Sequence, residues 1–177
     1  MSSDNYYETG MYFDRGEAEA AVDRLNTLGY TPNDISVMMD DKTREKAFAA
    51  EVGAKTTEGL ATGAVAGGVL GAIVAGLTAT GSVFAIAGTG GAATPFVVGP
   101  LAAALAGLGI GGAAGGIVGA LVGLGIGEQR AKQYEQGLRE GGILIAVRPK
   151  GENTEKVREA LRDRYATDYA GEVGARR

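Results

Sequence analysis

A long segment without charged or amide side chains constrains this chain more than any other feature. From Gly59 to Gly127 there is no Asp, Glu, Lys, Arg, Asn or Gln, and all the charged residues lie in the flanks 1–58 and 128–177. A domain of this size in water normally shows polar side chains at every helical turn. We therefore expect the segment 59–127 to be covered by lipid or by other protein.

The flank 1–58 is expected to form two strands and two helices. Its first residues are rich in aromatic and β-favouring side chains, which is typical of a strand. Asp14 with Glu17 three residues later resembles a capping box at a helix start, and Gly29 is a helix stop. The expected elements are a strand over 6–13, a helix over 15–28, a strand over 35–39 and a helix over 40–51.

The flank 128–177 is also expected to alternate helices and strands. Ile143 to Val147 is an uninterrupted apolar run, typical of a strand that lies in the centre of a sheet or is covered on both faces. Gly141-Gly142 ends the helix before it, and Asn153 or Thr154 caps the helix after it. The expected elements are a helix over 128–139, a strand over 143–147, a helix from 154 to about 165, and a short edge strand around 169–173.

The order of these elements predicts an α+β fold, a ferredoxin-like sandwich with an insertion between its second and third strands. Each flank alone is too small to bury a good core. We expect 1–58 and 128–177 to form one head together, within one chain or exchanged between two chains. The segment 59–127 is then an inserted Gly/Ala-rich helical hairpin.

Glycines spaced four residues apart predict that the insertion forms helices that pack closely. A four-residue step stays on one face of a helix, so the glycines leave a groove in which a second helix can approach. The helices are expected over about 60–79 and about 97–127, the second starting near Gly99-Pro100. The helix-packing residues are Gly59, Gly63, Gly67, Gly71, Gly107, Gly111, Gly115, Gly119, Gly123 and Gly127.

The surroundings of these helices are left open between a bilayer, the interior of a soluble homo-oligomer and a disordered Gly-Ala segment. Twenty helical residues span about 30 Å, the thickness of a bilayer core. A hairpin would return both flanks to one side, and basic residues near its ends agree with a cytoplasmic head. These residues are Arg44, Lys46, Lys55, Arg130, Lys132 and Arg139. No secretory signal peptide is expected, because the first residues lack a basic region followed by an apolar run.

No catalytic, metal or cofactor site is expected. The chain has neither His nor Cys, so imidazole bases, thiol nucleophiles and Cys-His metal sites are excluded. Its net charge of −4 and the absence of a basic stripe argue against binding to nucleic acid. Gly107-x-Gly109-x-x-Gly112 matches the dinucleotide fingerprint, but chance explains such a match where glycine is this frequent.

Two small groups of residues have both a functional and a structural interpretation. Asp40-Asp41, with Asp14 across the sheet, has the residue types of a carboxylate site, but we expect the pair to lie in a loop and cap the helix that starts near Lys42. Tyr6, Tyr7 and Tyr12 are expected to be strand residues, some facing the core, rather than a stacking surface for a ligand. The mixed charges from Glu128 to Lys132 are expected to form a solvated helix face.

Several short motifs resemble the bacterial general stress protein domain, a family with heat-induced members and a layout similar to that of cyanobacterial low-temperature-induced proteins. The resemblance covers about 9–161 and is most specific where a Lys-x-Tyr-Glu-x-Gly block leads into Gly-Gly-Ile-Leu. The motifs are Ile35-Ser36-Val37, Asp41-Lys42-Thr43-Arg44, Glu58-Gly59-x-Ala61-Thr62-Gly63-Ala64, Ala131-Lys132-x-Tyr134-Glu135-x-Gly137 and Gly141-Gly142-Ile143-Leu144. The resemblance implies a stress-associated, membrane-linked protein without catalytic or ligand residues.

Together these features predict a non-enzymatic, stress-associated protein that self-associates through glycine-zipper helices. In the first hypothesis the helices are inserted in or attached to a membrane, with the head in the cytoplasm, and the partners are further copies of the chain and lipid. The first alternative is a soluble homo-oligomeric scaffold with the hairpins in its apolar interior. The second is a small-molecule-sensing ferredoxin-like module, although no residue marks its pocket.

Overall fold

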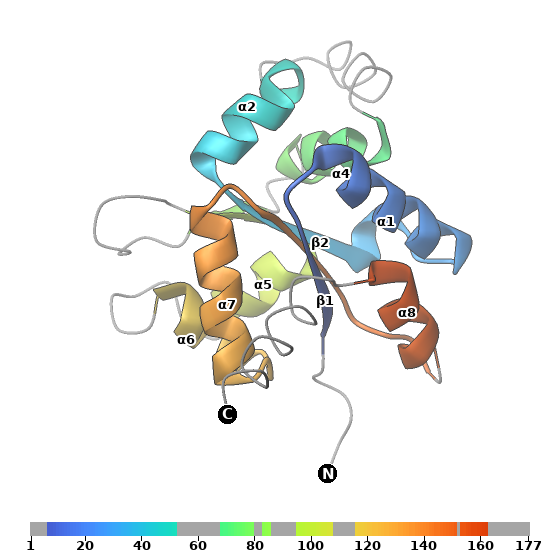
Figure 1. The fold of residues 1–177 in the computed structure, drawn as a ribbon. Coiled ribbons are helices and arrows are strands. Elements are labelled where there is room, and N and C mark those ends of the chain that lie inside the picture. Colours follow the sequence, from blue (N-terminus) through green and yellow to red (C-terminus); the bar gives the residue numbers. More distant parts are fainter. Residues whose placement is uncertain are drawn as a thin grey trace, which may run out of the picture.

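A computed structural model describes residues 7–52, 68–79, 83–85, 95–107, 116–151 and 153–162, which form a mixed α+β fold (Figure 1). The predicted α+β class is confirmed. The elements are β1 (Glu8–Tyr12), α1 (Arg15–Thr27), the 3-10 helix η2 (Pro32–Asp34), β2 (Ile35–Asp40), α2 (Asp41–Val52), α4 (Gly68–Ala79), β3 (Val83–Ala85), β4 (Pro95–Val98), α5 (Pro100–Gly107), α6 (Gly116–Gly123), α7 (Glu128–Arg139), β5 (Ile143–Val147) and α8 (Thr154–Leu161).

The five strands form one sheet in the order β1-β5-β2-β4-β3, in which all neighbours are antiparallel. β5 from the C-terminal flank lies between β1 and β2 from the N-terminal flank, with Met11 opposite Leu144 and Val37 opposite Ile145. β1, α1 and β2 are therefore a split β-α-β unit. The two flanks fold against each other within one chain, and β5 has the central position that its apolar sequence indicates.

The insertion also supplies strands, which differs from the predicted helical hairpin. β4 pairs with β2, and β3 pairs with β4, so the insertion extends the sheet of the head. Val97 and Val98 were expected at the start of the second long helix and lie instead in β4. The reason is local, because Phe96 and these two valines favour a pleated strand, whereas a helix starts readily only at Pro100.

The C-terminal end of the insertion is a helix and a turn rather than one helix as far as Gly127. α6 ends at Gly123, and Gly125 has a left-handed backbone with φ of 85°. The Ile126 N–H donates to the Leu121 carbonyl at 3.1 Å, and the Gly125 N–H donates to the Val122 carbonyl at 2.9 Å. These bonds form a Schellman motif, which ends a helix at a glycine. Gly127 is the N-cap residue of α7.

Two hydrophobic cores cover the two faces of the sheet (Figure 1). The α1 core lies between the sheet and helices α1, α4 and α8; the α7 core lies between the sheet and helices α5, α6 and α7. Alternate residues of a strand point to opposite faces. Accordingly Ile143 and Ile145 of β5 belong to the α1 core, and Leu144 and Ala146 belong to the α7 core.

The uncharged insertion is built into both cores. Leu70 and Ile73 of α4 are buried in the α1 core, and Leu101, Leu105 and Ile117 of α5 and α6 are buried in the α7 core. The sequence predicts that lipid or other protein covers the insertion. In the structure, a sheet that is apolar on both faces covers these residues from within the chain. In the part of the chain that the structure describes, no helix has both the length and the apolar character needed to cross a membrane.

Candidate functional site

The glycines predicted to pack helices together are divided between opposite faces of the sheet. Gly71 is buried on α4, beside the α1 core, whereas Gly119 and Gly123 lie on α6, beside the α7 core. Gly107 is the last residue of α5 and Gly127 caps α7. The sheet therefore separates the described parts of the two stripes. The residues Gly59, Gly63, Gly67, Gly111 and Gly115 lie outside the described residues.

α6 has one buried side and one open side, although neither carries a polar residue. Its buried side holds Ile117, Ala120 and Leu121. The open side, which we call the α6 outer face, follows helical spacing of three and four residues. It consists of Gly116, Gly119, Val122 and Gly123.

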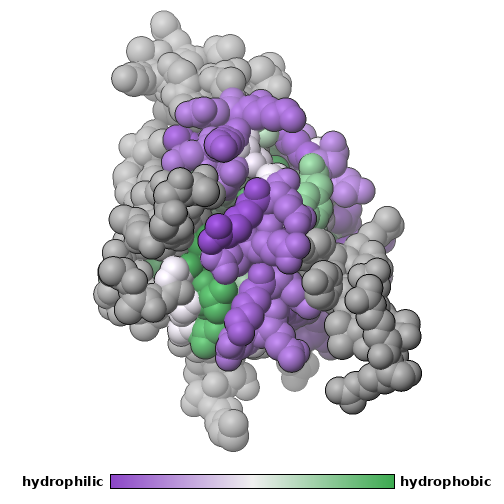
Figure 2. Space-filling model, turned by 60° about the vertical axis from the view of Figure 1, so that its left-hand side comes forward, coloured by the Kyte–Doolittle hydropathy of each residue, from purple (hydrophilic) through white to green (hydrophobic). Residues whose placement is uncertain are grey.

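The α6 outer face is open because no described residue packs against it closely. A Cβ atom built at Gly119 would meet no atom within 4 Å among the described residues, and the same is true at Gly116. The Val122 side chain is 42% exposed, which makes it one of the large exposed hydrophobic residues of the described chain. Figure 2 shows a hydrophobic strip beside a broad hydrophilic area on this side of the molecule.

Charged residues of α7 form ion pairs along that helix, which packs against α6. Lys132 pairs with Glu128 at 2.7 Å, and Arg139 pairs with Glu135 at 3.0 Å, each one helical turn apart. The hydrogen bond from Lys132, together with its charge, lowers the pKa of the Glu128 carboxyl. The prediction of a solvated helix face from Glu128 to Lys132 is confirmed, since Glu128, Gln129 and Lys132 are exposed.

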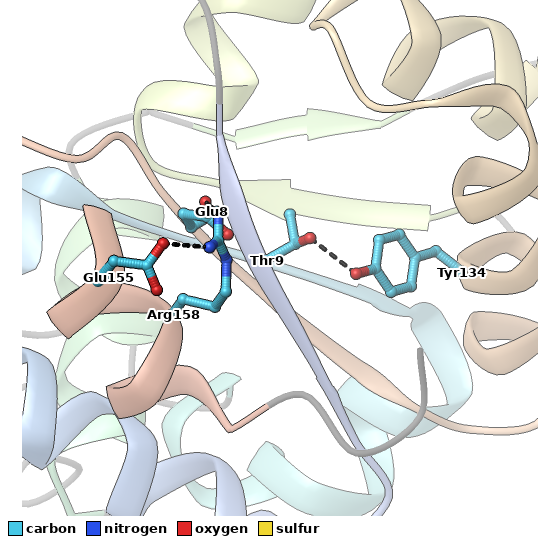
Figure 3. A network of polar contacts seen from close by, with 5 residues as sticks. All are labelled: Glu8, Thr9, Tyr134, Glu155 and Arg158. Carbon is cyan, nitrogen blue, oxygen red and sulfur yellow. Dashed lines mark hydrogen bonds and ion pairs between the residues drawn. The ribbon is translucent and has the colours of Figure 1, made fainter. Parts of the chain in front are cut away.

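A network of polar contacts holds the edge strand β1 between two helices (Figure 3). On one side the buried Glu8 carboxylate pairs with Arg158 of α8 at 2.7 Å, and Arg158 also pairs with Glu155 at 2.6 Å. On the other side the Thr9 hydroxyl and the Tyr134 hydroxyl of α7 lie 2.7 Å apart. Successive strand residues point to opposite faces, so these two residues connect β1 to both helical layers.

The block Lys-x-Tyr-Glu-x-Gly followed by Gly-Gly, which carried the most specific part of the family resemblance, packs against β1. Tyr134 supplies the contact with Thr9. A Cβ atom at Gly137 would lie 3.1 Å from Met11 Cε, and one at Gly142 would lie 2.6 Å from Met11 Sδ. Both glycines make room for Met11, so this block has a structural role in docking α7 and β5 on β1.

Two polar contacts connect the insertion to the N-terminal flank. Arg15 pairs with Glu19 at 2.9 Å, and the Glu19 carboxylate lies close to Gly68, the first residue of α4. A carboxylate at a helix N-terminus is favourable because of the helix dipole. On the other face of the sheet, the buried Ser36 hydroxyl accepts a hydrogen bond from the Leu101 N–H at 2.9 Å. Ser36 thus caps α5 from a neighbouring strand.

Of the acidic residues that could form a carboxylate site, Asp40 and Asp14 cap helices. The Asp40 carboxylate accepts from the Thr43 N–H at 2.6 Å at the start of α2, and Asp14 accepts from the Glu17 N–H at 3.1 Å at the start of α1. Asp41 pairs with Arg44 at 3.1 Å. Among the described residues, no three acidic side chains cluster closely enough to hold a metal ion.

The aromatic residues considered as a stacking surface lie in the core where they are described. Tyr7 and Tyr12 are buried, and the Tyr12 hydroxyl donates to the Leu161 carbonyl. Tyr6 lies outside the described residues, as do Gly109 and Gly112 of the dinucleotide-like motif. Among the features that the sequence analysis singled out and the structure describes, the α6 outer face most resembles an interaction site.

Comparison of the chain with protein-family models, with curated proteins and with solved structures finds no match. The resemblance to the bacterial general stress protein domain stays a prediction. The function is therefore argued from the residues and their arrangement.

Proposed function

We propose that this is a non-enzymatic protein whose copies associate through the α6 outer face. The observation that carries the proposal is the surface at Gly119 and Val122, where a Cβ atom on the half-buried Gly119 would meet no described atom and the Val122 side chain is 42% exposed. A glycine in a helix interior costs about 1 kcal/mol relative to alanine. Close approach of a second helix is a physical reason for keeping glycine there.

A second copy of the same face is the partner that fits this surface best. Gly119 and Gly123 lie one turn apart, so two α6 helices can cross with their backbones close together. Val122 of each copy would then be buried against the glycines of the other. The charged pairs of α7 would border the contact and remain in water, as polar residues do at the rim of an interface.

We also propose that the head completes a ferredoxin-like sandwich. The split β-α-β unit with β5 between β1 and β2 supports this arrangement. The additional strand that the sandwich needs is the one predicted around 169–173, which lies outside the described residues. Association with stress, and attachment to the cytoplasmic face of a membrane, are proposed from the sequence alone.

The proposal is tested by measuring the mass of the purified full-length chain by sedimentation velocity. We expect an oligomer for the wild type and a shift toward monomer for Gly119→Leu, because the leucine side chain fills the approach groove. The matched control is Gly76→Leu. Gly76 is another helical glycine whose Cβ would meet no described atom within 4 Å, but it lies on α4 across the sheet.

Two outcomes would contradict self-association through α6: a monomeric wild type, or equal effects of the Gly119 and Gly76 substitutions. Washing the membranes of expressing cells with alkaline carbonate separates the two proposed locations. Recovery in the detergent-free supernatant as one large species supports the scaffold, whereas release by detergent alone supports insertion. In either fraction, Gly119→Leu is expected to reduce cross-linking between copies and Gly76→Leu is not.

A further inference from the structure

A cleft between α1 and α8 gathers three cationic side chains that the proposed association does not use. Its larger part is an open pocket of about 260 Å³ lined by Arg24 of α1 and by Lys156 and Arg162 from α8 and its C-terminal end. A neighbouring hollow of about 150 Å³ reaches toward Tyr12 and is lined by the same two arginines. The cleft lies on the α1 face of the sheet, away from α6.

Each cation reaches the cleft from a defined position. The Arg24 Nε donates to the Ala160 carbonyl at 2.6 Å, which holds the guanidinium between the two helices. Lys156 and Arg162 are exposed. Within the described ranges, the side chain of neither residue has a hydrogen-bond or ion-pair partner.

The backbone of Arg162 is the second observation that points to a role for its side chain. Its φ of 44° makes it the one described residue other than glycine with a positive φ. A left-handed conformation costs a side-chain-bearing residue about 1 kcal/mol or more, and glycine adopts it freely. Since α1, α6 and α7 in this chain end at Gly29, Gly125 and Gly141, the arginine at the end of α8 is not needed to end the helix.

Two carboxylates also line the cleft and limit what it can bind. Glu17 lies at the smaller hollow and Glu159 at the larger pocket. Three cations against two anions leave the cleft with one positive charge in excess, so a large polyanion is not favoured. The carboxylates can instead accept hydrogen bonds from hydroxyl groups of a small ligand.

We propose that this cleft binds the phosphate group of a small phosphate monoester. Arg24 and Arg162 present planar guanidinium groups that match phosphate oxygens, and Lys156 adds a mobile point charge. The volume is below the range of roughly 300–1,000 Å³ typical of sites for drug-sized ligands, which restricts the ligand to a compact ester. Leu28 and Ala160 supply the apolar contact for its organic part.

The test is isothermal titration of the full-length chain with glycerol 3-phosphate and with inorganic phosphate at low ionic strength. We expect saturable binding that Lys156→Gln weakens by about tenfold, the usual consequence of losing one charge-assisted hydrogen bond. The matched control is Lys42→Gln on α2, which removes the same charge from an exposed helix position that does not line the cleft. Equal weakening by the control would overturn the proposal, and so would the absence of saturable binding together with a negative result in the vesicle experiment below.

Arg162→Gly separates a binding role from a structural one. Glycine removes the cation and relieves the left-handed backbone, so the melting temperature is expected to rise by about 2–4 °C while phosphate affinity falls. A stabilised variant with unchanged affinity would mean that Arg162 has no part in binding, and would overturn the site as proposed.

The same phosphate chemistry occurs in a free ester and in a lipid headgroup. Flotation with phosphatidylcholine vesicles, with and without phosphatidic acid, distinguishes the two sources. Binding of glycerol 3-phosphate that depends on Lys156 supports a free ligand. Binding that needs phosphatidic acid in the vesicle and depends on Lys156, without binding of the free ester, supports the headgroup. If the chain binds neither the free ester nor the vesicles, the phosphate site is wrong, and the proposed association through α6 is unaffected.

Discussion

α4 and α6 come from the same uncharged insertion and carry the same four-residue glycine pattern, yet the structure uses them differently. α4 is held to the head by its apolar residues in the α1 core, has the Glu19 carboxylate close to its first residue, and buries its stripe glycine Gly71. α6 buries one side in the α7 core and leaves Gly119 without a close neighbour among the described residues. The comparison teaches that glycine spacing identifies a helix face, but not whether that face is already occupied.

The largest expected effect is a loss of stability on changing the buried inner side that α4 and α6 both have. Leu70 of α4 and Leu121 of α6 are both fully buried. Replacing either by alanine removes buried methyl groups and leaves a cavity, which costs about 2–5 kcal/mol of stability. Urea denaturation of each variant measures the loss. A cost below about 1 kcal/mol for Leu121→Ala alone would mean that α6 is not part of the folded domain, and the comparison would fail.

Glycine-to-alanine substitutions within α4 are expected to have opposite signs. Gly68 has a left-handed backbone with φ of 63°, and its added Cβ would lie 2.9 Å from the Glu19 carboxylate. Gly68→Ala should therefore lose about 1–2 kcal/mol of stability. Gly76→Ala, in open space, should gain up to about 1 kcal/mol. Thermal unfolding of both variants provides the measurement, and a stabilising Gly68→Ala would argue against the contact with Glu19.

A smaller loss is expected at the anchor of α5. Ser36→Ala removes the buried hydroxyl that accepts from the Leu101 N–H, and loss of such a cap costs about 1 kcal/mol. Thr27→Ala is the control, because the Thr27 hydroxyl makes an exposed bond to the Asp23 carbonyl. Its effect should stay within about 0.5 kcal/mol. If both variants unfold at the same urea concentration, Ser36 does not hold the insertion to β2.

The smallest effect is a dependence on pH in a region remote from both glycine helices. Burial raises the pKa of Asp34, but hydrogen bonds from Lys150 and Thr31 outweigh it, and the pKa lies below its ordinary value of 3.8. Because the pKa of Asp34 is lower in the folded state, the ionised carboxylate stabilises the fold at pH values above 3.8. This stabilisation is lost as the pH falls through the pKa of the folded state.

Asp34→Asn should accordingly lower stability slightly at neutral pH and reduce the decline of stability on the acid side. Urea midpoints at neutral pH and below pH 3.8 measure this difference. The control is Asp23→Asn, at an exposed position of α1. A variant with the same acid decline as the wild type would show that the contacts of Asp34 with Lys150 and Thr31 add nothing.

The head of the fold was predictable from local signals. The Asp14 cap, the Gly29 and Gly141 stops and the apolar run of Ile143–Val147 all specify elements that the structure contains. These signals act over a few residues, through capping hydrogen bonds, backbone conformation and side-chain alternation. The apolar run predicted a strand that is central in a sheet or covered on both faces, and β5 is both. Its antiparallel pairing with β1 and β2 was not specified by the run, because edge strand β1 is buried on both faces as well.

The arrangement of the insertion was predicted less well. The glycine spacing and the lack of charge predict a helical hairpin whose second helix starts at Val97, whereas Val97 and Val98 lie in strand β4. The structure pairs them with β2, and that pairing depends on the free edge of a strand far away in the sequence. The cleft between α1 and α8 was not predictable from the sequence either. Arg24, Lys156 and Arg162 are far apart or isolated along the chain and come together only when β1, α1 and α8 pack.

The sequence by itself determined the α+β class, the helix caps and stops, and the separation of charged flanks from an uncharged insertion. These properties depend on neighbouring residues and on whether each side chain is polar or apolar, and both are given by the sequence. The tertiary structure alone decided what covers the insertion. A sheet with two apolar faces accepts α4 on one side and α5 with α6 on the other. Burial is a property of which surfaces meet, so it leaves Gly71 enclosed and Gly119 open despite their common spacing.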